Sequence, residues 1–342
     1  MNLSWETFTI QAKHPFKISR SVQESVERVW VRVTEDGQEG WGEADPSPYY
    51  GETAATVVAA LEQLRPVLES AAVPDFDGLE TLERILAGAL DRNGSARAAV
   101  SAAVHDLVGK RAGQPLWKLW GLDPAGAPPS SFTIGLDEPA VLRKKVEEAA
   151  EYPILKVKLG TDRNEELLST ISDAATPGTV LRVDANGAWT ASEAIERIAM
   201  LVDFGVEFVE QPLNKADLEG YRFLHGRSAL PIIADESCID SADVPGLVGL
   251  VDGINIKLAK CGGPYEALRM IDAARSCGLS VMMGCMLESS LGIAPAAHLA
   301  SLLDHADLDG AALLASDPFV GPGLDGPAIR VGEAPGLGVE RA

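Results

Sequence analysis

Lysines and carboxylates recur along this chain at nearly constant intervals. Lys158, Asp184, Glu210, Asp235 and Lys257 each stand at the end of a short apolar run, and successive members are 26, 26, 25 and 22 residues apart. An interval of this length fits one strand followed by one helix. The five side chains should therefore lie at the same height on the carboxyl-terminal face of a (β/α) barrel, which is the face that carries barrel active sites.

The three carboxylates of Asp184, Glu210 and Asp235 are predicted to bind a divalent cation. They come from adjacent strands, and their mutual repulsion needs a positive charge among them. Oxygen ligands favour a hard ion, and a site that keeps some waters and meets a substrate carboxylate suits Mg²⁺. The predicted cofactor is therefore magnesium.

Lys158 and Lys257 should flank a substrate held on this metal. Removing a proton from the carbon next to a carboxylate gives an enediolate, whose second negative charge a divalent cation stabilises as a Lewis acid. The neighbouring cation Lys156, two residues along the same strand, favours the neutral form of Lys158, which can then act as a base. Two bases on opposite faces of one carbon predict racemisation or epimerisation.

Eight short apolar runs supply the strands that must position these residues. They begin near residues 131, 153, 180, 206, 231, 252, 279 and 305, and a polar turn and a longer helical segment follow most of them. Strands that alternate with helices form right-handed βαβ units with a parallel sheet, and eight such units close into a barrel. The predicted fold class is α/β, a modified (β/α)8 TIM-type barrel.

The first third of the chain has a different pattern. Residues 26–34 alternate like a strand, a turn and a short returning strand follow, and alanine- and leucine-rich runs with helical spacing begin near residue 53. We expect an α+β capping domain in residues 1–120, the barrel in residues 121–315, and a C-terminal segment, residues 316–342, that packs back on the capping domain.

Composition limits the partners and the compartment. The formal net charge of -21 argues against nucleic acid and anionic membranes as partners. No apolar stretch approaches the roughly 20 residues that span a bilayer, and the first residues lack the layout of a signal peptide. Four cysteines without CxxC spacing argue against a disulfide framework or a zinc site and fit a reducing cytoplasm.

Five motifs resemble those of the enolase superfamily, in its muconate lactonising enzyme subgroup, over nearly the whole chain. They are KVK, VDANGAW, VEQP, IADES and NIKLAKCGG. A narrower resemblance, to the dipeptide epimerases, rests on GCMLESSLGIAPAAHLA at 284–300, DLDG at 307–310 and SDPF at 316–319. It implies a magnesium-dependent enzyme that moves the α-proton of the C-terminal residue of an L,L-dipeptide.

The same resemblance implies a set of substrate contacts. Asp307 and Asp309 would bind the α-ammonium group of the dipeptide through charge-assisted hydrogen bonds. Lys156 would contact the substrate carboxylate, and Thr133 would be a lesser substrate contact. Cys285 falls on a pocket position of the family, but its sequence context fits a small buried residue equally well. Lys257 is preferred as a base over Lys260 because it keeps the Asn-Ile-Lys context.

A capping-domain loop of residues 17–25 would close over the substrate side chain. Arg20 in this loop could meet an acidic side chain, as in an L-Ala-D/L-Glu substrate, or could be a solvated loop arginine. The alternatives are an N-acylamino acid racemase or an o-succinylbenzoate synthase, whose substrates lack the cationic terminus that an aspartate pair would bind. A non-catalytic barrel binding protein is a third reading. We also expect a homo-oligomer.

Overall fold

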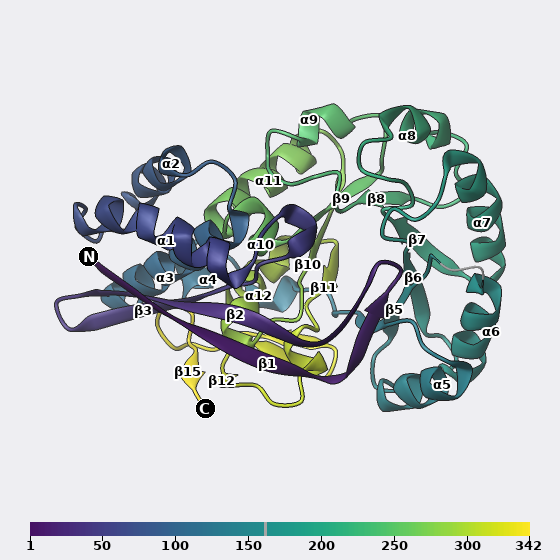
Figure 1. Ribbon diagram of the computed structural model, residues 1–342, viewed down its shortest axis with the longest axis horizontal. Helices are drawn as coiled ribbons and strands as arrows, with labels where there is room; N and C mark the ends of the chain where they lie inside the picture. The colour runs from purple at the N-terminus through teal and green to yellow at the C-terminus, as the bar shows by residue number, and fades with distance from the viewer. Residues whose placement is uncertain (161–162) are drawn as a thin grey trace.

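The eight apolar runs form one parallel sheet in the computed structural model, which describes residues 1–160 and 163–342 (Figure 1). Its strands are β4 (Phe132–Ile134), β5 (Ile154–Lys158), β6 (Val180–Asp184), β7 (Val206–Glu210), β8 (Ile232–Ala234), β9 (Gly253–Ile256), β10 (Ser280–Gly284) and β11 (His305–Asp307). Neighbouring strands pair in sequence order, and a parallel bridge from Ser130 to Ala306 joins the two ends of the sheet. The predicted barrel is confirmed.

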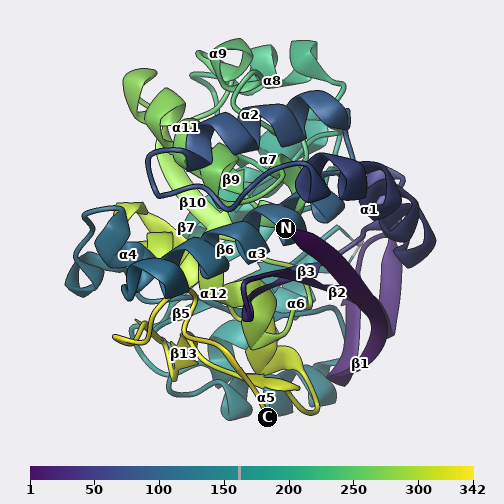
Figure 2. The ribbon, with the colours of Figure 1, turned by 90° about the vertical axis from the view of Figure 1, so that its left-hand side faces the viewer.

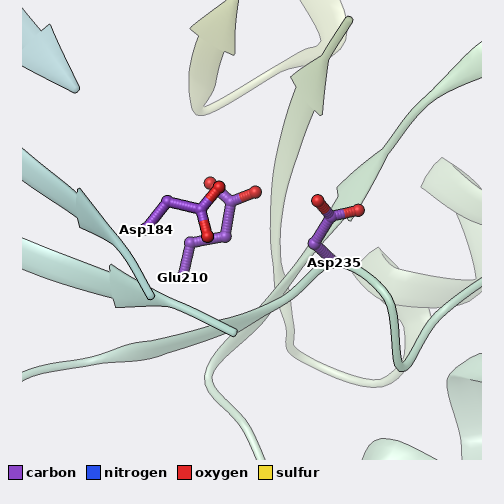
Figure 3. Close-up of side chains that lie close together, drawn as sticks. All are labelled: Asp184, Glu210 and Asp235. Atoms are coloured by element: carbon purple, nitrogen blue, oxygen red, sulfur yellow. The ribbon is translucent and has the colours of Figure 1, made fainter. Parts of the chain in front are cut away.

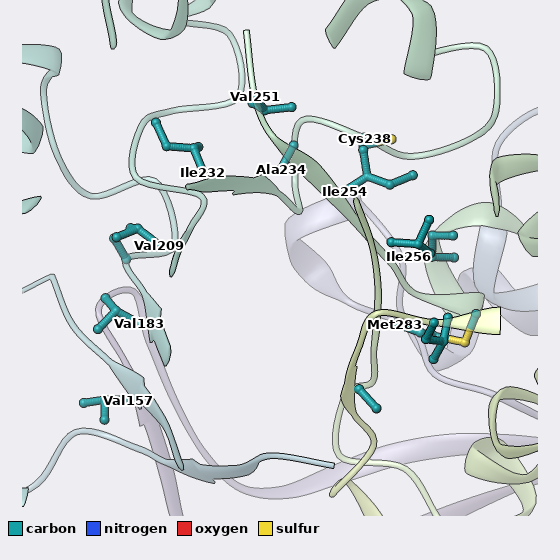
Figure 4. Packing of buried hydrophobic residues seen from close by; sticks show 14 of the residues in the cluster. Val157, Val183, Val209, Ile232, Ala234, Cys238, Val251, Ile254, Ile256 and Met283 are labelled. Carbon is teal, nitrogen blue, oxygen red and sulfur yellow. The ribbon is translucent and has the colours of Figure 1, made fainter. Parts of the chain in front are cut away.

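Helices cover the outside of the barrel. They are α5 (Pro139–Glu148), α6 (Asn164–Ala174), α7 (Ala191–Asp203), α8 (Leu218–Leu224), α9 (Val244–Leu247), α10 (Leu258–Cys261), α11 (Pro264–Ser276) and α12 (Ser290–Leu299). Apolar strand residues such as Val157, Val183 and Ile254 belong to the large buried cluster that the helices complete (Figure 4). Because side chains alternate along a strand, Lys156 and Lys158 on either side of Val157 are free to point into the barrel.

The capping domain is a three-stranded antiparallel sheet with helices packed on it. The strands are β1 (Asn2–Ile18), β2 (Ser21–Glu35) and β3 (Gln38–Ala44), and the helices are α1 (Ala54–Glu69), α2 (Leu79–Ala89), α3 (Gly94–Ala112) and α4 (Leu116–Leu119). Gly40 and Gly42 let α3 lie unusually close to β3, because a Cβ at either position would fall within 2.1 Å of a carbonyl oxygen of α3. Short 3-10 helices occur at Pro48–Tyr50, Pro124–Gly126, Ala300–Leu302 and Ala311–Leu313.

The segment 17–25 is not a loop, and that prediction is wrong. β1 continues to Ile18 and β2 begins at Ser21, so the two strands form a long hairpin that pairs Phe16 with Gln23 and closes through a two-residue turn. Polar side chains on both faces hid the strand pattern in the sequence. The hairpin tip rests on the barrel, where the Leu136 N–H donates to the Lys17 carbonyl at 2.9 Å.

The C-terminal residues contact both parts of the protein. They contain β12 (Phe319–Val320), β13 (Gly323–Asp325), β14 (Ala328–Arg330) and β15 (Glu340–Arg341). β12 and β13 contact α12, and Figure 2 shows β13 near this helix. Phe319 and Leu337 pack in one buried cluster with Trp30 of β2 and Leu116 of α4. Within the described residues, no helix is both long and apolar enough to cross a membrane.

Candidate active site

The predicted site residues gather around one cavity of about 400 Å³ at the carboxyl ends of the strands. The capping domain supplies part of the cavity wall, through the hairpin tip and the segment around Tyr49 and Tyr50. The predicted residues that line it are Arg20, Thr133, Lys156, Lys158, Asp235, Lys257, Cys285, Asp307 and Asp309. Asp184 and Glu210 lie behind this lining, and neither is accessible to solvent.

Asp184, Glu210 and Asp235 form a compact group of carboxylates (Figure 3). Asp184 and Glu210 end β6 and β7 and are paired in the ladder between these strands, and Asp235 directly follows β8. One oxygen from each lies within 4.8 Å of the others, and all three residues are buried. The register of parallel strands thus brings together the three residues that the sequence spacing selected.

This group fits a divalent cation. Burial and the neighbouring Asp184 carboxylate raise the pKa of Glu210 to about 8, although Lys156 opposes them. Glu210 Oε2 is buried and accepts no hydrogen bond of good geometry, even though Lys156 Nζ lies 2.6 Å away. A cation among the three carboxylates would remove the repulsion and occupy this oxygen. Carboxylate oxygens are the ligands that Mg²⁺ prefers.

Lys158 and Lys257 approach the carboxylates from opposite sides of the group. Lys158 Nζ lies 2.6 Å from Asp184 Oδ2, and Lys257 Nζ lies 2.8 Å from Asp235 Oδ2. Burial lowers the pKa of Lys257, but the Asp235 carboxylate outweighs burial and the pKa is raised above its ordinary value. Both amines line the cavity, so a substrate bound over the carboxylates would have one amine on each side.

Asp307 and Asp309 also line the cavity, at the end of β11. Asp307 accepts hydrogen bonds from Lys156 Nζ at 2.8 Å and from Ser131 Oγ at 2.6 Å. Asp309 accepts one from the Thr133 N–H at 2.6 Å. Burial and the neighbouring Asp307 raise the pKa of Asp309 to about 7. A cationic ligand group beside these two carboxylates would offset their repulsion and lower the pKa of Asp309.

Lys260, which the sequence left aside, does not line the cavity. Its amine is fully buried and contacts Asp235 Oδ1 at 2.6 Å, the Asp235 carbonyl at 2.6 Å, and the carbonyls of Cys238 and Asn255 at 3.0 Å. Four acceptors in fixed positions make Lys260 a residue that orients Asp235. Lys257, in contrast, faces the cavity.

Two further polar residues support the carboxylates and carry unusual backbone angles. Asn186 has φ 47° and donates from its N–H to Asp184 Oδ1 at 2.8 Å, and Gln211 has φ 40°. The Gln211 side chain accepts the N–H of Asp235 at 2.9 Å and donates to the Leu213 carbonyl at 2.8 Å. Residues outside glycine rarely adopt positive φ, and such strain gathers where a site must be held in place.

Arg20 lies at the tip of the hairpin and has partners on the barrel. Its Nη2 is 2.6 Å from Glu236 Oε1, its Nη1 donates to the Asn186 carbonyl at 2.9 Å, and its guanidinium stacks 4.0 Å from the centre of the Tyr49 ring. Cys285 lies near the aspartates, with Sγ 3.3 Å from the Asp307 carbonyl, and burial raises the pKa of its thiol well above the ordinary value.

Sequence reasoning missed a buried polar contact between the two domains. Arg28 of β2 pairs with Asp45 at 2.5 Å and donates to the Leu287 carbonyl, and Glu43 of β3 accepts from the Ser289 N–H at 2.9 Å. Asp45 and Arg28 both line the cavity. The sequence feature that could have indicated this contact is the pair of acidic residues, Glu43 and Asp45, in GWGEADP. Charged residues at the end of a strand need partners when they are buried.

Fold and site together define a barrel enzyme that binds a divalent cation and moves a proton. Residues 5–121 match the family described as "Mandelate racemase / muconate lactonizing enzyme, N-terminal domain", and residues 141–341 match "Enolase C-terminal domain-like". The chain belongs to the enolase superfamily and, within it, to the dipeptide epimerases. The resemblance read from the sequence motifs is thereby confirmed.

Three relatives illustrate this membership. The L-Ala-D/L-amino acid epimerase of Maribacter sp. is 39% identical over 97% of this chain and 95% of its own. The L-Ala-D/L-Glu epimerase of Bacteroides thetaiotaomicron is 37% identical over 99% and 88%. The crystal structure of a dipeptide epimerase from Enterococcus faecalis, complexed with Mg and the dipeptide L-Leu-L-Tyr, is 34% identical, with a TM-score of 0.91 and coverage of 99% and 98%.

Proposed function

We propose that this protein is a magnesium-dependent dipeptide epimerase, an isomerase that inverts the α-carbon of the C-terminal residue of a dipeptide. The observation that carries the proposal is that one cavity brings together two groups of carboxylates from different parts of the barrel sheet. Asp184, Glu210 and Asp235 come from the ends of β6, β7 and β8, Asp307 and Asp309 come from the end of β11, and the Lys156 amine lies between Glu210 and Asp307. A zwitterion with separated charges fits between them.

The chain's own residues have distinct tasks in this proposal. The magnesium ion, when bound to Asp184, Glu210 and Asp235, supplies a Lewis acid that favours negative charge on the substrate carboxylate. Lys158 and Lys257 exchange the α-proton on opposite faces, so that removal on one side and return on the other inverts the carbon.

Asp307 and Asp309 distinguish a dipeptide from the alternative substrates. An N-acylated amino acid or a succinylbenzoate precursor carries no ammonium group. Such a substrate would leave two buried carboxylates facing a neutral or anionic group, which is unfavourable. The 34–39% identity to proteins named dipeptide or L-Ala-D/L-amino acid epimerases supports the same choice.

The test is α-proton exchange in D2O. The protein is incubated with magnesium and a set of L-Ala-L-Xaa dipeptides, and deuterium at each α-carbon is read by mass spectrometry. We expect exchange at the C-terminal residue, lost or strongly weakened in Asp309→Asn. The matched control is Asp325→Asn, an exposed carboxylate on β13. Exchange of N-acylated amino acids in place of dipeptides would contradict the proposal.

We further propose a homo-oligomer in the cytoplasm, without nucleic acid or membrane partners. The division into residues 1–120, 121–315 and 316–342 also stays a prediction. Size-exclusion chromatography with light scattering would test the proposed homo-oligomer. Limited proteolysis that releases a stable fragment ending near residue 120 would contradict the proposed docking of the C-terminal segment on the capping domain.

A further inference from the structure

We infer that Arg20 fastens the hairpin tip to the barrel through Glu236, and that the enzyme therefore acts on dipeptides whose C-terminal side chain is uncharged rather than acidic. The inference rests on the proposed function and names the substrate class of the same site. It separates two roles for Arg20 that the sequence could not distinguish, a receptor for a substrate carboxylate and a fixed contact between the two domains.

Arg20 is already committed to partners within the protein. It reaches Glu236 Oε1 at 2.6 Å and the Asn186 carbonyl at 2.9 Å, and one face of its guanidinium covers the Tyr49 ring. These contacts join the hairpin, the segment around Tyr49 and the ends of two barrel strands. The fixed geometry of a guanidinium suits such a contact, since several donors are directed at once.

Glu236 cannot release Arg20 without cost. Its side chain is only 1% exposed, against 33% for Arg20, and its second oxygen, Oε2, is buried and has no hydrogen-bond partner. If Arg20 turned to a substrate carboxylate, Glu236 would remain as a buried charge beside another anion. Removing one partner from a buried ion pair is strongly unfavourable for this reason.

The C-terminal side chain of a bound dipeptide must face this region. In the proposed function, the substrate carboxylate lies over Asp184, Glu210 and Asp235, and the ammonium group lies at Asp307, which ends β11, and at Asp309, two residues further on. The side chain on the α-carbon would then point toward the ends of β6 and β8 and the capping domain. The cavity wall there consists of Ile18, Arg20, Gln23, Tyr49, Tyr50, Asn186 and Glu236.

No spare cation is left for an acidic side chain. Every lysine or arginine among the described residues of the cavity wall has a carboxylate partner within 2.8 Å. A metal ion on Asp184, Glu210 and Asp235 would free only the lysines at the reacting carbon. Arg20 and Arg28 keep Glu236 and Asp45, which lie outside that group. An uncharged side chain would meet Ile18, Tyr50 and the amide of Gln23, which line this part of the cavity.

The test compares two dipeptides of nearly equal shape, L-Ala-L-Gln and L-Ala-L-Glu, by kcat/KM for α-proton exchange with magnesium. We expect L-Ala-L-Gln to be favoured by about tenfold or more, which is the scale on which a site rejects a group that it cannot pair. In Arg20→Gln, KM should rise for both substrates and the preference should stay or increase. A preference for L-Ala-L-Glu that disappears in Arg20→Gln would overturn the inference.

A second variant, Glu236→Gln, should shift the substrate preference in the opposite direction. It leaves Arg20 without its carboxylate partner, so the ratio of kcat/KM for the two dipeptides should move toward L-Ala-L-Glu by about tenfold. The control is Lys215→Gln, which removes an exposed cation 5.0 Å from the Tyr49 ring and outside the cavity, and which should leave the ratio unchanged. An unchanged ratio in Glu236→Gln would also overturn the inference. Absence of exchange with every dipeptide would overturn the proposed function, and this inference with it.

Discussion

Glu83 should make the capping domain less stable as the pH rises. It lies on α2 and is buried against α3, where Ser101 Oγ donates to Glu83 Oε1 at 2.5 Å and His105 Nδ1 lies 3.4 Å from the same oxygen. Burial raises the pKa of Glu83 from 4.5 to about 7, although the Ser101 hydrogen bond and the charge of Arg97 oppose it. Burial also lowers the pKa of His105 to about 4, so the imidazole facing Glu83 is neutral.

The sign follows from proton binding in the two states. The folded protein binds the Glu83 proton more tightly than the unfolded chain, so the stabilisation is complete below pH 4.5 and is lost as the pH rises toward 7. The full shift of about 2.5 units corresponds to about 3.4 kcal/mol at 1.36 kcal/mol per unit. Between pH 5 and pH 8 the loss is about 2.5 kcal/mol of unfolding free energy.

Glu83→Gln replaces the carboxyl group with an amide of similar shape, which cannot ionise. The measurement is the free energy of unfolding in urea for wild type and variant, at pH 5 and at pH 8. From pH 5 to pH 8, the unfolding free energy of the variant should rise by about 2.5 kcal/mol relative to that of the wild type. The titration of His105 does not affect this difference, because both proteins contain His105. Glu80→Gln, an exposed change on the same helix, is the control. A difference between wild type and Glu83→Gln that is equal at both pH values would refute the reasoning.

Three further predictions concern the active site. Magnesium should raise the Tm of the wild type, by a stabilisation of about 2.7 kcal/mol at 100 times Kd, and should have little effect on Glu210→Gln; thermal unfolding with and without EDTA measures this. Lys260→Met should lower the unfolding free energy by about 3 kcal/mol, because it removes a buried partner of Asp235, and an unchanged urea midpoint would contradict this role. Lys158→Ala and Lys257→Ala should each lose exchange for one epimer and keep it for the other, the two variants losing opposite epimers in D2O; loss of the same epimer in both would count against two opposed bases.

The spacing of a few residues predicted the centre of the site because barrel strands repeat one local unit. In the structure, Lys158 pairs with Asp184 across β5 and β6, and Asp184 pairs with Glu210 across β6 and β7. Each pair is separated by one strand and one helix, so the distance along the sequence determined the position in space. The eight strands were predictable for the same reason.

Contacts between the domains could not be predicted in this way. Arg20 and Glu236 are separated by 216 residues, and Glu43 and Ser289 by 246, with no repeating unit between them. Their proximity depends on how the capping domain docks on the barrel. The same holds for the hairpin tip, whose strands were read as a loop because their side chains are polar on both faces.

The packing of Phe319 and Leu337 against Trp30 has a consequence for the order of events during synthesis. A domain built only from early residues can fold on the ribosome while the rest of the chain is still being made. The face of the capping sheet that carries Val29, Val31 and Val33 packs in a cluster built from residues 1–108 alone, so it can form early. The face that carries Trp30 gains Phe319 and Leu337 only after the barrel has been translated. This apolar face therefore stays partly uncovered while the barrel is being made.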